Sequence, residues 1–122
     1  MSKNLILGLR TAIYKVPDLE AAKNWYAQVF NTQPYFDEVF YVGFNIGGYE
    51  LGLQPDERKV GDNTVIYWGV ENAEGAYADF LAAGATSFEE PQNVGGDIVV
   101  ATVKDPWGNV IGLIYNPHFK AV

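Results

Sequence analysis

Few side chains in this sequence are candidates for a catalytic or ligand-binding role, and Glu50 is one of them. The 122 residues contain no cysteine and one histidine, His118. Thiol nucleophiles, Ser-His-Asp arrangements and metal sites with two imidazoles from one chain are therefore excluded. Glu50 falls in a short strand expected over residues 49–53, on the face that also carries Gly52 and Gln54. A carboxylate on a partly apolar strand face can act as a general base with a raised pKa.

Other candidate motifs are read as structural. His118 follows Asn116 and Pro117 in a C-terminal tail that is expected to be exposed, without a neighbour that would make it a base. The glycine pairs at 47–48 and 95–96 lack the spacing and the following helix of a phosphate-binding loop. We interpret both pairs as turns.

Charge and aromatic content narrow the class of partner. Fifteen acidic against eight basic residues give a net charge of −7, which disfavours nucleic acid and anionic lipid surfaces. Aromatic residues make up 15% of the chain, many of them within 35–44. Aromatic rings at an acidic site favour planar or cationic ligands. No apolar run is long enough for a membrane span and no secretory signal is recognised, so a cytoplasmic location is expected.

Hydrophobic periodicity predicts two helices and eight strands. The helices are expected over residues 19–31, with Asp18 as N-cap, and over 73–83, with Gly84 as the stop. The strands are expected over residues 6–16, 35–38, 40–46, 49–53, 64–70, 87–89, 98–103 and 110–115. Between the two halves, residues 55–62 are polar and contain Pro and Gly, as linkers do.

Alternation along these strands separates a core face from an opposite face. The side chains expected under the helices are Tyr14, Leu51, Leu53, Trp68, Ile111, Leu113 and Tyr115. Trp25 is also expected to pack between helix and sheet. The opposite face is expected to carry Thr11, Glu50, Gly52, Gln54, Val65, Tyr67, Val110, Gly112 and Ile114.

The two halves of the sequence also resemble each other. The segment Val16-Pro17-Asp18 that precedes the first helix is matched by Val70-Glu71-Asn72 before the second. The segment Gly48-Tyr49-Glu50-Leu51-Gly52-Leu53 is echoed by Gly108-Asn109-Val110-Ile111-Gly112-Leu113. A repeat of this length is a whole folding unit. The chain is therefore expected to be one domain, 1–122, with modules at about 5–54 and 63–117.

These repeats, together with the turn Asp105-Pro106-Trp107-Gly108-Asn109 before the last strand, resemble the vicinal oxygen chelate superfamily. This superfamily includes glyoxalase I, extradiol dioxygenases and bleomycin resistance proteins. The resemblance covers nearly the whole chain. It implies an α+β fold of two tandem βαβββ modules forming curved mixed sheets with a concave cleft, and it implies a homodimer.

The resemblance also implies where metal ligands would stand. Enzymes of the glyoxalase I type hold a divalent metal with inward His and Glu side chains on the first and last strands of each module. In this sequence those positions are Thr11, Gly52, Val65 and Gly112, which offer one hydroxyl and no imidazole or carboxylate. A register slip by one residue would offer only Glu50 or Leu51. We therefore predict that no metal and no other cofactor is bound.

The leading interpretation is a metal-independent small-molecule-binding protein similar to bleomycin resistance proteins, which sequester an antibiotic in a cleft at a dimer interface. The alternative is a glyoxalase- or dioxygenase-like enzyme, a lyase, isomerase or dioxygenase, with Glu50 as general base. The residues predicted to bind the ligand are Thr11, Glu50, Gln54, Tyr67 and Trp107. In a third interpretation, the opposite face is filled by its own side chains and the domain is an interaction module.

Overall fold

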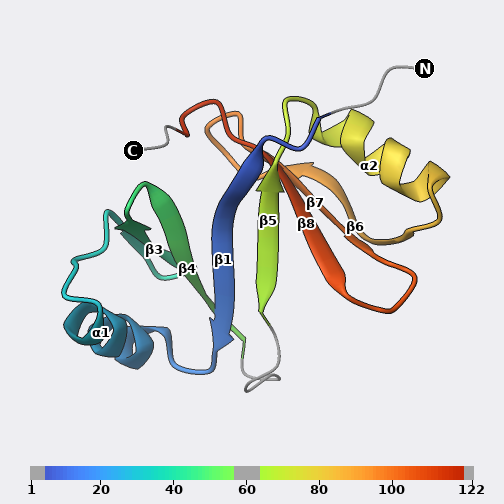
Figure 1. Ribbon diagram of the computed structural model, residues 1–122. Helices are drawn as coiled ribbons and strands as arrows, with labels where there is room; N and C mark the ends of the chain where they lie inside the picture. Colours follow the sequence, from blue (N-terminus) through green and yellow to red (C-terminus); the bar gives the residue numbers. More distant parts are fainter. Residues whose placement is uncertain (1–4, 57–63, 120–122) are drawn as a thin grey trace. The chain divides into compact units, whose positions relative to one another are not determined.

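The computed structural model describes residues 5–56 and 64–119, which fall into two compact units. Of the described residues, unit 1 comprises 5–10 and 66–119, and unit 2 comprises 11–56 and 64–65. Of the linker expected at 55–62, residues 57–62 lie outside the described residues. The elements of the described parts are β1 (Gly8–Val16), α1 (Leu19–Val29), β2 (Phe36–Glu38), β3 (Tyr41–Ile46), β4 (Tyr49–Pro55), β5 (Val65–Gly69), α2 (Ala73–Ala82), β6 (Thr86–Asn93), β7 (Val99–Lys104) and β8 (Val110–Tyr115) (Figure 1).

Unit 2 is built on a mixed ladder with the strand order β2-β3-β4-β1. The strand β1 runs parallel to β4, with Thr11 beside Glu50 and Tyr14 beside Leu53. The hairpin β3–β4 is antiparallel, and its turn residues Gly47 and Gly48 both have positive φ angles of 62° and 93°. Such angles suit glycine and give a tight hairpin, so this predicted turn is confirmed.

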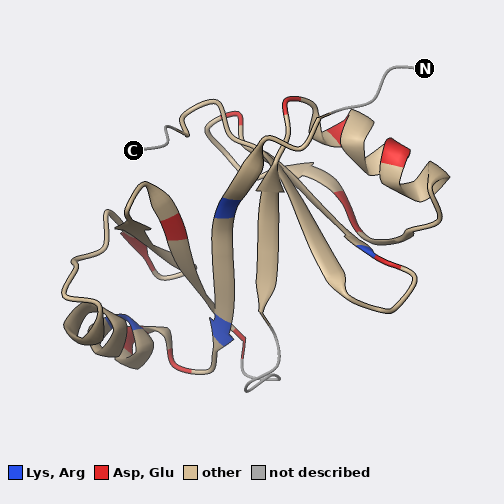
Figure 2. Cartoon of the chain, viewed as in Figure 1, with Lys and Arg blue, Asp and Glu red and all other residues tan. Residues whose placement is uncertain are grey.

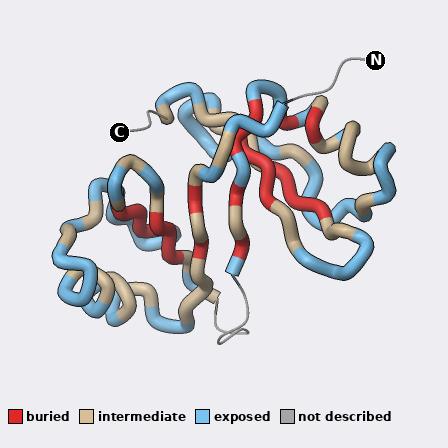
Figure 3. Tube along the Cα trace, viewed as in Figure 1, coloured by how far each residue is buried: buried red, intermediate tan, exposed pale blue. Residues whose placement is uncertain are grey.

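The helix α1 covers one face of this ladder. Buried side chains of β3 and β4 form the centre, with half-buried side chains of β1 and α1 around it. The buried residues are Val42, Phe44, Leu51 and Leu53; Tyr14, Leu19, Ala22, Tyr26, Ala27 and Ile46 pack against them. No residue of α1 is itself fully buried, and Figure 3 shows the contrast between this helix and its strands.

The packing prediction for Trp25 is wrong. Its side chain is 56% exposed and lies edge-on to the Tyr26 ring, at a centroid distance of 4.8 Å. The residues of α1 that face the sheet include Leu19, Ala22 and Tyr26, spaced three and four apart. Trp25 precedes Tyr26 by one position, which turns its side chain by about 100° around the helix and away from the sheet.

Unit 1 repeats this plan with the order β5-β8-β7-β6. The strands β5 and β8 are parallel, whereas β8–β7 and β7–β6 are antiparallel. The helix α2 packs over β6, β7 and β8. Its core contains Val70, Ala73, Ala76 and Leu113, with Tyr77, Phe80, Val99, Ile111 and Tyr115 around them. Two units of this kind confirm the predicted α+β fold.

Trp68 was expected under α2 but is 39% exposed. It lies on β5 and pairs with Leu113 of β8. Because α2 lies over the three other strands of this ladder, it leaves the β5 side less covered. The remaining side chains expected under the helices do pack there, in both units.

Each helix begins at a capping residue, as predicted for α1. The Asp18 carboxylate accepts a hydrogen bond from Ala21 N at 3.0 Å, and Asn72 Oδ1 accepts one from Gly75 N at 2.9 Å. At the other end of α2, Gly84 has a φ angle of 109° directly after the C-cap Ala83, which confirms it as the stop.

We expect Asp18→Ala and Asn72→Ala each to lower the free energy of unfolding by about 1 kcal/mol, because each leaves a backbone N–H of the first turn without its acceptor. Urea denaturation of the purified variants measures this loss. Asp18→Asn is the matched control, since it keeps an acceptor oxygen. A cost for Asp18→Asn equal to that of Asp18→Ala would contradict the capping role.

Acidic residues lie on both helices and on strands of both units, as Figure 2 shows. An ion-pair network joins Lys23 to Glu20 and Asp37 at 3.1 Å each. Neither helix in those parts is long and apolar enough to cross a membrane.

Candidate functional site

Glu50 lies on the face of the unit 2 ladder that is turned away from α1. Leu51 and Leu53 of β4 belong to the core under the helix. Because successive side chains of a strand point to opposite faces, Glu50 and Gly52 lie on the face away from the helix. Across the ladder, Glu50 is beside Thr11 of β1 and opposite Asn45 of β3. The sequence-based placement of Glu50 therefore agrees with the register.

Two tyrosines donate hydrogen bonds to this carboxyl group. The Tyr35 hydroxyl donates a hydrogen bond to Glu50 Oε1, and the Tyr41 hydroxyl donates one to Oε2. Tyr41 opens β3, and Tyr35 is held just before β2 by a bond from its backbone N to Gly43 O, 3.0 Å long. Both oxygens of Glu50 are thus engaged by side chains that the β2–β3 hairpin supplies.

Two glycines make room for this arrangement. A Cβ atom at Gly52 would lie 2.6 Å from Tyr41 Cζ, so the phenol ring occupies the space in which a side chain at position 52 would stand. A Cβ atom at Gly43 would lie 3.3 Å from Tyr35 Cε1 and 3.4 Å from Glu50 Cδ. The two glycines are paired across β3 and β4. Because both residues lack a side chain, the Glu50 carboxyl group and the rings of Tyr35 and Tyr41 can pack beside them.

Burial raises the pKa of the Glu50 carboxyl from its ordinary 4.5 to about 7. The cause is desolvation, which disfavours the charged form. At neutral pH the protonated and ionised forms are therefore both populated. Such a group can bind a cation or an N–H donor, and it can also take up and release a proton.

Further aromatic side chains lie beside the tyrosines that hold Glu50. Phe36 packs edge-on against Phe40 and Tyr41, at centroid distances of 6.0 and 6.1 Å. Tyr35 and Phe40 are 64% and 62% exposed, which is unusual for large rings. We call Tyr35, Phe36, Phe40 and Tyr41 the aromatic cluster. It offers ring faces for a planar or cationic ligand beside the carboxyl group.

In unit 1, a tyrosine ring likewise fills the space beside the equivalent glycine, Gly112. Tyr67 of β5 pairs with Gly112 of β8, and a Cβ atom at Gly112 would lie 2.6 Å from Tyr67 Cδ2 and 2.7 Å from Cγ. Burial, with a smaller contribution from the charge of Glu89, raises the pKa of Tyr67 to about 12. The phenol is therefore a neutral hydrogen-bond donor at physiological pH.

The four positions at which the resemblance implies metal ligands do not fit a metal ion. Thr11 and Val65 are buried, and the spaces at Gly52 and Gly112 are taken by the rings of Tyr41 and Tyr67. Within residues 5–56 and 64–119, no three His, Cys, Asp or Glu side chains converge as a metal site requires. The donor set in each unit therefore lacks the carboxylate and imidazole groups that hold divalent cations.

The structure distributes the five predicted ligand-binding residues over both units. Thr11 and Glu50 are neighbours in unit 2, and Gln54 lies further along β4, beside Lys15. Tyr67 and Trp107 belong to unit 1. Trp107 is 83% exposed in the turn between β7 and β8, where Asp105 Oδ1 accepts hydrogen bonds from the backbone N atoms of Trp107 and Asn109. A ligand role for Tyr67 or Trp107 remains a prediction.

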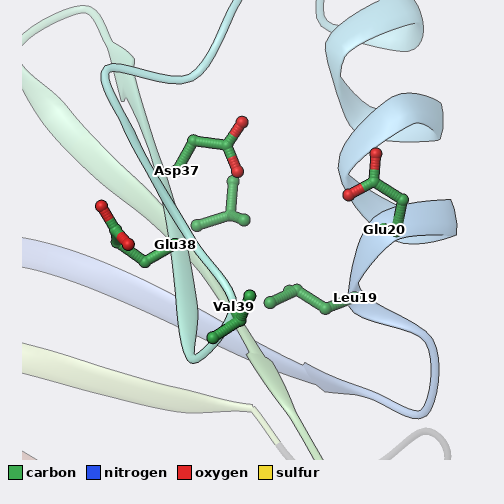
Figure 4. Close-up of a pocket in the computed structure, with 6 residues that line it drawn as sticks. Leu19, Glu20, Asp37, Glu38 and Val39 are labelled. Atoms are coloured by element: carbon green, nitrogen blue, oxygen red, sulfur yellow. The ribbon is translucent and has the colours of Figure 1, made fainter.

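A second feature of unit 2 lies on the helix side of the ladder. A cavity of about 290 Å³ is lined by Leu19 and Glu20 of α1 and by Asp37, Glu38, Val39 and Val42 of the β2–β3 hairpin (Figure 4). Lys23 bridges Glu20 and Asp37 beside it. The bonds to those two carboxylates, first that to Asp37, raise the pKa of Lys23. Glu50 is on the other face, so this cavity is not the Glu50 site.

Sequence reasoning found Glu50 but missed the two tyrosines that hold it. Tyr35 and Tyr41 were noticed only as part of an aromatic stretch. The available signal was the pair Gly43 and Gly52, because two glycines facing each other on adjacent strands leave space that nearby large side chains can fill.

Comparison with known proteins identifies the family. Residues 9–113 match the Glyoxalase/Bleomycin resistance protein/Dioxygenase superfamily, and the chain belongs to this superfamily. The resemblance inferred from the repeats and the turn is thereby confirmed. No curated protein matches the sequence.

Solved structures of the same fold are distant in sequence. Streptomyces coelicolor methylmalonyl-CoA epimerase in complex with 2-nitronate-propionyl-CoA superposes with a TM-score of 0.78 at 14% identity, covering 93% of this chain and 99% of that one. The Mn(II)-bound glyoxalase from Novosphingobium aromaticivorans gives 0.69 at 20% identity, over 97% of this chain and 42% of that one. A superfamily member from Vibrio splendidus 12B01 gives 0.66 at 16% identity, over 88% and 99%. At these identities the likeness shows the fold alone.

Proposed function

We propose that this protein binds a small molecule at the Glu50 site without the help of a metal ion. The observation that carries the proposal is a half-buried carboxyl group, clasped by the hydroxyls of Tyr35 and Tyr41 and bordered by the exposed aromatic cluster. A ligand with a planar body and a cationic or N–H donor group matches this chemistry. Binding without turnover would be similar to the sequestration known for bleomycin resistance proteins.

Benzamidine is a suitable first probe, because it joins a flat ring to a cationic group with two N–H donors. We expect it to bind the wild-type protein, and benzoate, an anion of similar shape, not to bind. Glu50→Gln is expected to weaken benzamidine by tenfold or more, since a hydrogen bond to a charged group is worth about 1.5–3 kcal/mol. Isothermal titration in the presence of EDTA measures both affinities and excludes a metal requirement.

The pH dependence sharpens this test. The cation needs the ionised carboxylate, so its affinity is expected to rise with pH and to level off above the Glu50 pKa of about 7. Glu38→Gln is the matched control, because Glu38 lines the cavity on the helix side. If Glu38→Gln weakens benzamidine and Glu50→Gln does not, the Glu50 proposal is overturned.

The second candidate is an enzyme with Glu50 as general base. The specific observation in its favour is the raised pKa, which suits a group that abstracts a proton near neutral pH. Structural neighbours that are named as an epimerase and a glyoxalase are consistent with it. The two candidates differ in the fate of the ligand: a binding protein returns it unchanged, whereas an enzyme converts it and loses turnover, but not folding, in Glu50→Gln.

Three further expectations accompany the proposal. Thr11, Gln54, Tyr67 and Trp107 remain predicted ligand contacts. A homodimer, with ligand clefts between its subunits, is expected by resemblance to bleomycin resistance proteins. A cytoplasmic location is expected from the sequence.

A further inference from the structure

A row of polar side chains crosses the unit 1 ladder at one level. Glu89 of β6 pairs with Thr102 of β7, Thr102 pairs with Gly112 of β8, and Gly112 pairs with Tyr67 of β5. The neighbouring residue of β8, Leu113, is in the core under α2. Alternation therefore places this row on the face away from the helix. All four residues of the row belong to unit 1, whereas Glu50 belongs to unit 2.

A β-bulge puts Glu89 into this row. Ser87 pairs with Val103, and regular pairing would bring Phe88 opposite Thr102. The register shifts at this point, so Glu89 pairs with Thr102 and Phe88 is left over. Ser87 accepts a hydrogen bond from the Tyr77 hydroxyl of α2 at 2.6 Å, which fixes it on the helix side. Bulges that re-aim a side chain are frequent beside functional sites.

The two ends of the row have complementary hydrogen-bonding capacity. Thr102, only 1% exposed, donates its hydroxyl to Glu89 Oε1 at 2.9 Å. This bond orients the carboxyl group and leaves Oε2 without a protein partner in the described residues. The Tyr67 side chain is 8% exposed, and its hydroxyl has no protein partner in those residues either. Its ring leans over Gly112, from β5 toward β7.

A buried phenol with an open donor is costly unless something accepts its proton. Every fully buried side-chain N or O atom of the described residues has a partner, so the Tyr67 hydroxyl reaches the surface of the row. The charge of Glu89 acts on Tyr67, which places the two groups in the same environment. A carboxylate acceptor and a neutral phenol donor thus lie in one row, near enough for the charge of Glu89 to act on Tyr67.

We propose that Glu89 and Tyr67 bind a small molecule with an N–H donor beside a carbonyl oxygen, such as a carboxamide or a lactam. The N–H group donates to Glu89 Oε2, and the carbonyl oxygen accepts from the Tyr67 hydroxyl. Thr102 is a positioning residue that holds the Glu89 carboxyl group. The proposal does not depend on the Glu50 site.

The test uses δ-valerolactam as the probe. N-methyl-δ-valerolactam, which has no N–H group, is the comparison compound. Titrations are followed by two-dimensional NMR of the full chain, with tyrosine rings and backbone amides labelled. We expect saturable shifts at Tyr67, Thr102 and Gly112 with δ-valerolactam. Loss of one hydrogen bond predicts that the N-methyl compound binds about threefold to tenfold more weakly.

Two conservative variants make the proposal falsifiable. Tyr67→Phe and Glu89→Gln are each expected to weaken δ-valerolactam by about threefold to tenfold. Glu90→Gln is the matched control in the same unit and is expected to bind like the wild type. The amide spectrum of each variant shows whether it is folded. Equal affinity in Tyr67→Phe and Glu89→Gln, shifts away from the row, or no saturable shift would overturn the proposal.

Discussion

Glu50→Gln is expected to remove a large part of the pH dependence of folding stability. The Glu50 pKa is about 7 in the folded protein, compared with an ordinary value of 4.5. The folded chain therefore holds this proton more tightly than the unfolded chain. The resulting stabilisation is complete below pH 4.5 and is lost as the pH rises through 7. One pKa unit is worth about 1.4 kcal/mol, so the total is about 3 kcal/mol.

The measurement is the free energy of unfolding in urea, from pH 4 to pH 8.5, for wild type and Glu50→Gln. Other acidic groups titrate in both proteins, so the difference between the two curves isolates Glu50. We expect Glu50→Gln to gain about 3 kcal/mol relative to wild type between the two ends of the range. Glu90→Gln reports what the loss of one exposed negative charge does by itself. A difference between wild type and Glu50→Gln that does not change with pH would refute the buried-carboxyl account.

The second large effect is expected at Gly112. Its missing Cβ would lie 2.7 Å from Tyr67 Cγ, the ring atom closest to the backbone of β5. The ring cannot rotate away from such a contact without moving its strand. We therefore expect Gly112→Ala to lower the free energy of unfolding by about 2–3 kcal/mol, as overpacked sites do. Thermal and urea denaturation measure the loss.

A double-mutant cycle with Tyr67→Ala tests the cause. If the ring is the obstacle, Gly112→Ala costs less than about 1 kcal/mol once the ring is removed, and the two substitutions are strongly non-additive. Gly52→Ala is a useful comparison, because its Cβ would meet the hydroxyl end of Tyr41, which can swing aside. Its cost is expected to be smaller, with the loss of the Tyr41–Glu50 bond as the main effect. Additive costs at Gly112 and Tyr67 would argue against the steric explanation.

Local signals in the sequence were sufficient for most of the fold. Asp18 as a cap, Gly47 and Gly48 as a hairpin and Gly84 as a stop each act through their own backbone or a few neighbours, so they can be predicted without tertiary information. The last strand, Val110–Tyr115, has the predicted bounds. β6 is longer than expected, Thr86–Asn93 rather than 87–89, because its bulges interrupt the alternation that predicts a strand.

The site was predicted less completely because it depends on register. Glu50 could be placed on a strand face from alternation alone. Its contacts with Tyr35 and Tyr41 require that β3 and β4 pair with Gly43 opposite Gly52, and a shift by one residue would turn every side chain to the other face. Trp25 and Trp68 were misplaced for a related reason: the apolar character of a residue does not say which part of a ladder the helix covers.

The tyrosines that lie over Gly52 and Gly112 also constrain how this lineage can change. A carboxylate at Gly112 would need the volume that the Tyr67 ring occupies, and a carboxylate at Gly52 would force the hydroxyl end of Tyr41 to move away from Glu50. Loss of the ring alone leaves a cavity. Each single step is therefore disfavoured, and only the pair of substitutions restores a packed site. Because of this epistasis, carboxylate ligands are harder to introduce at these two positions than the small size of glycine suggests.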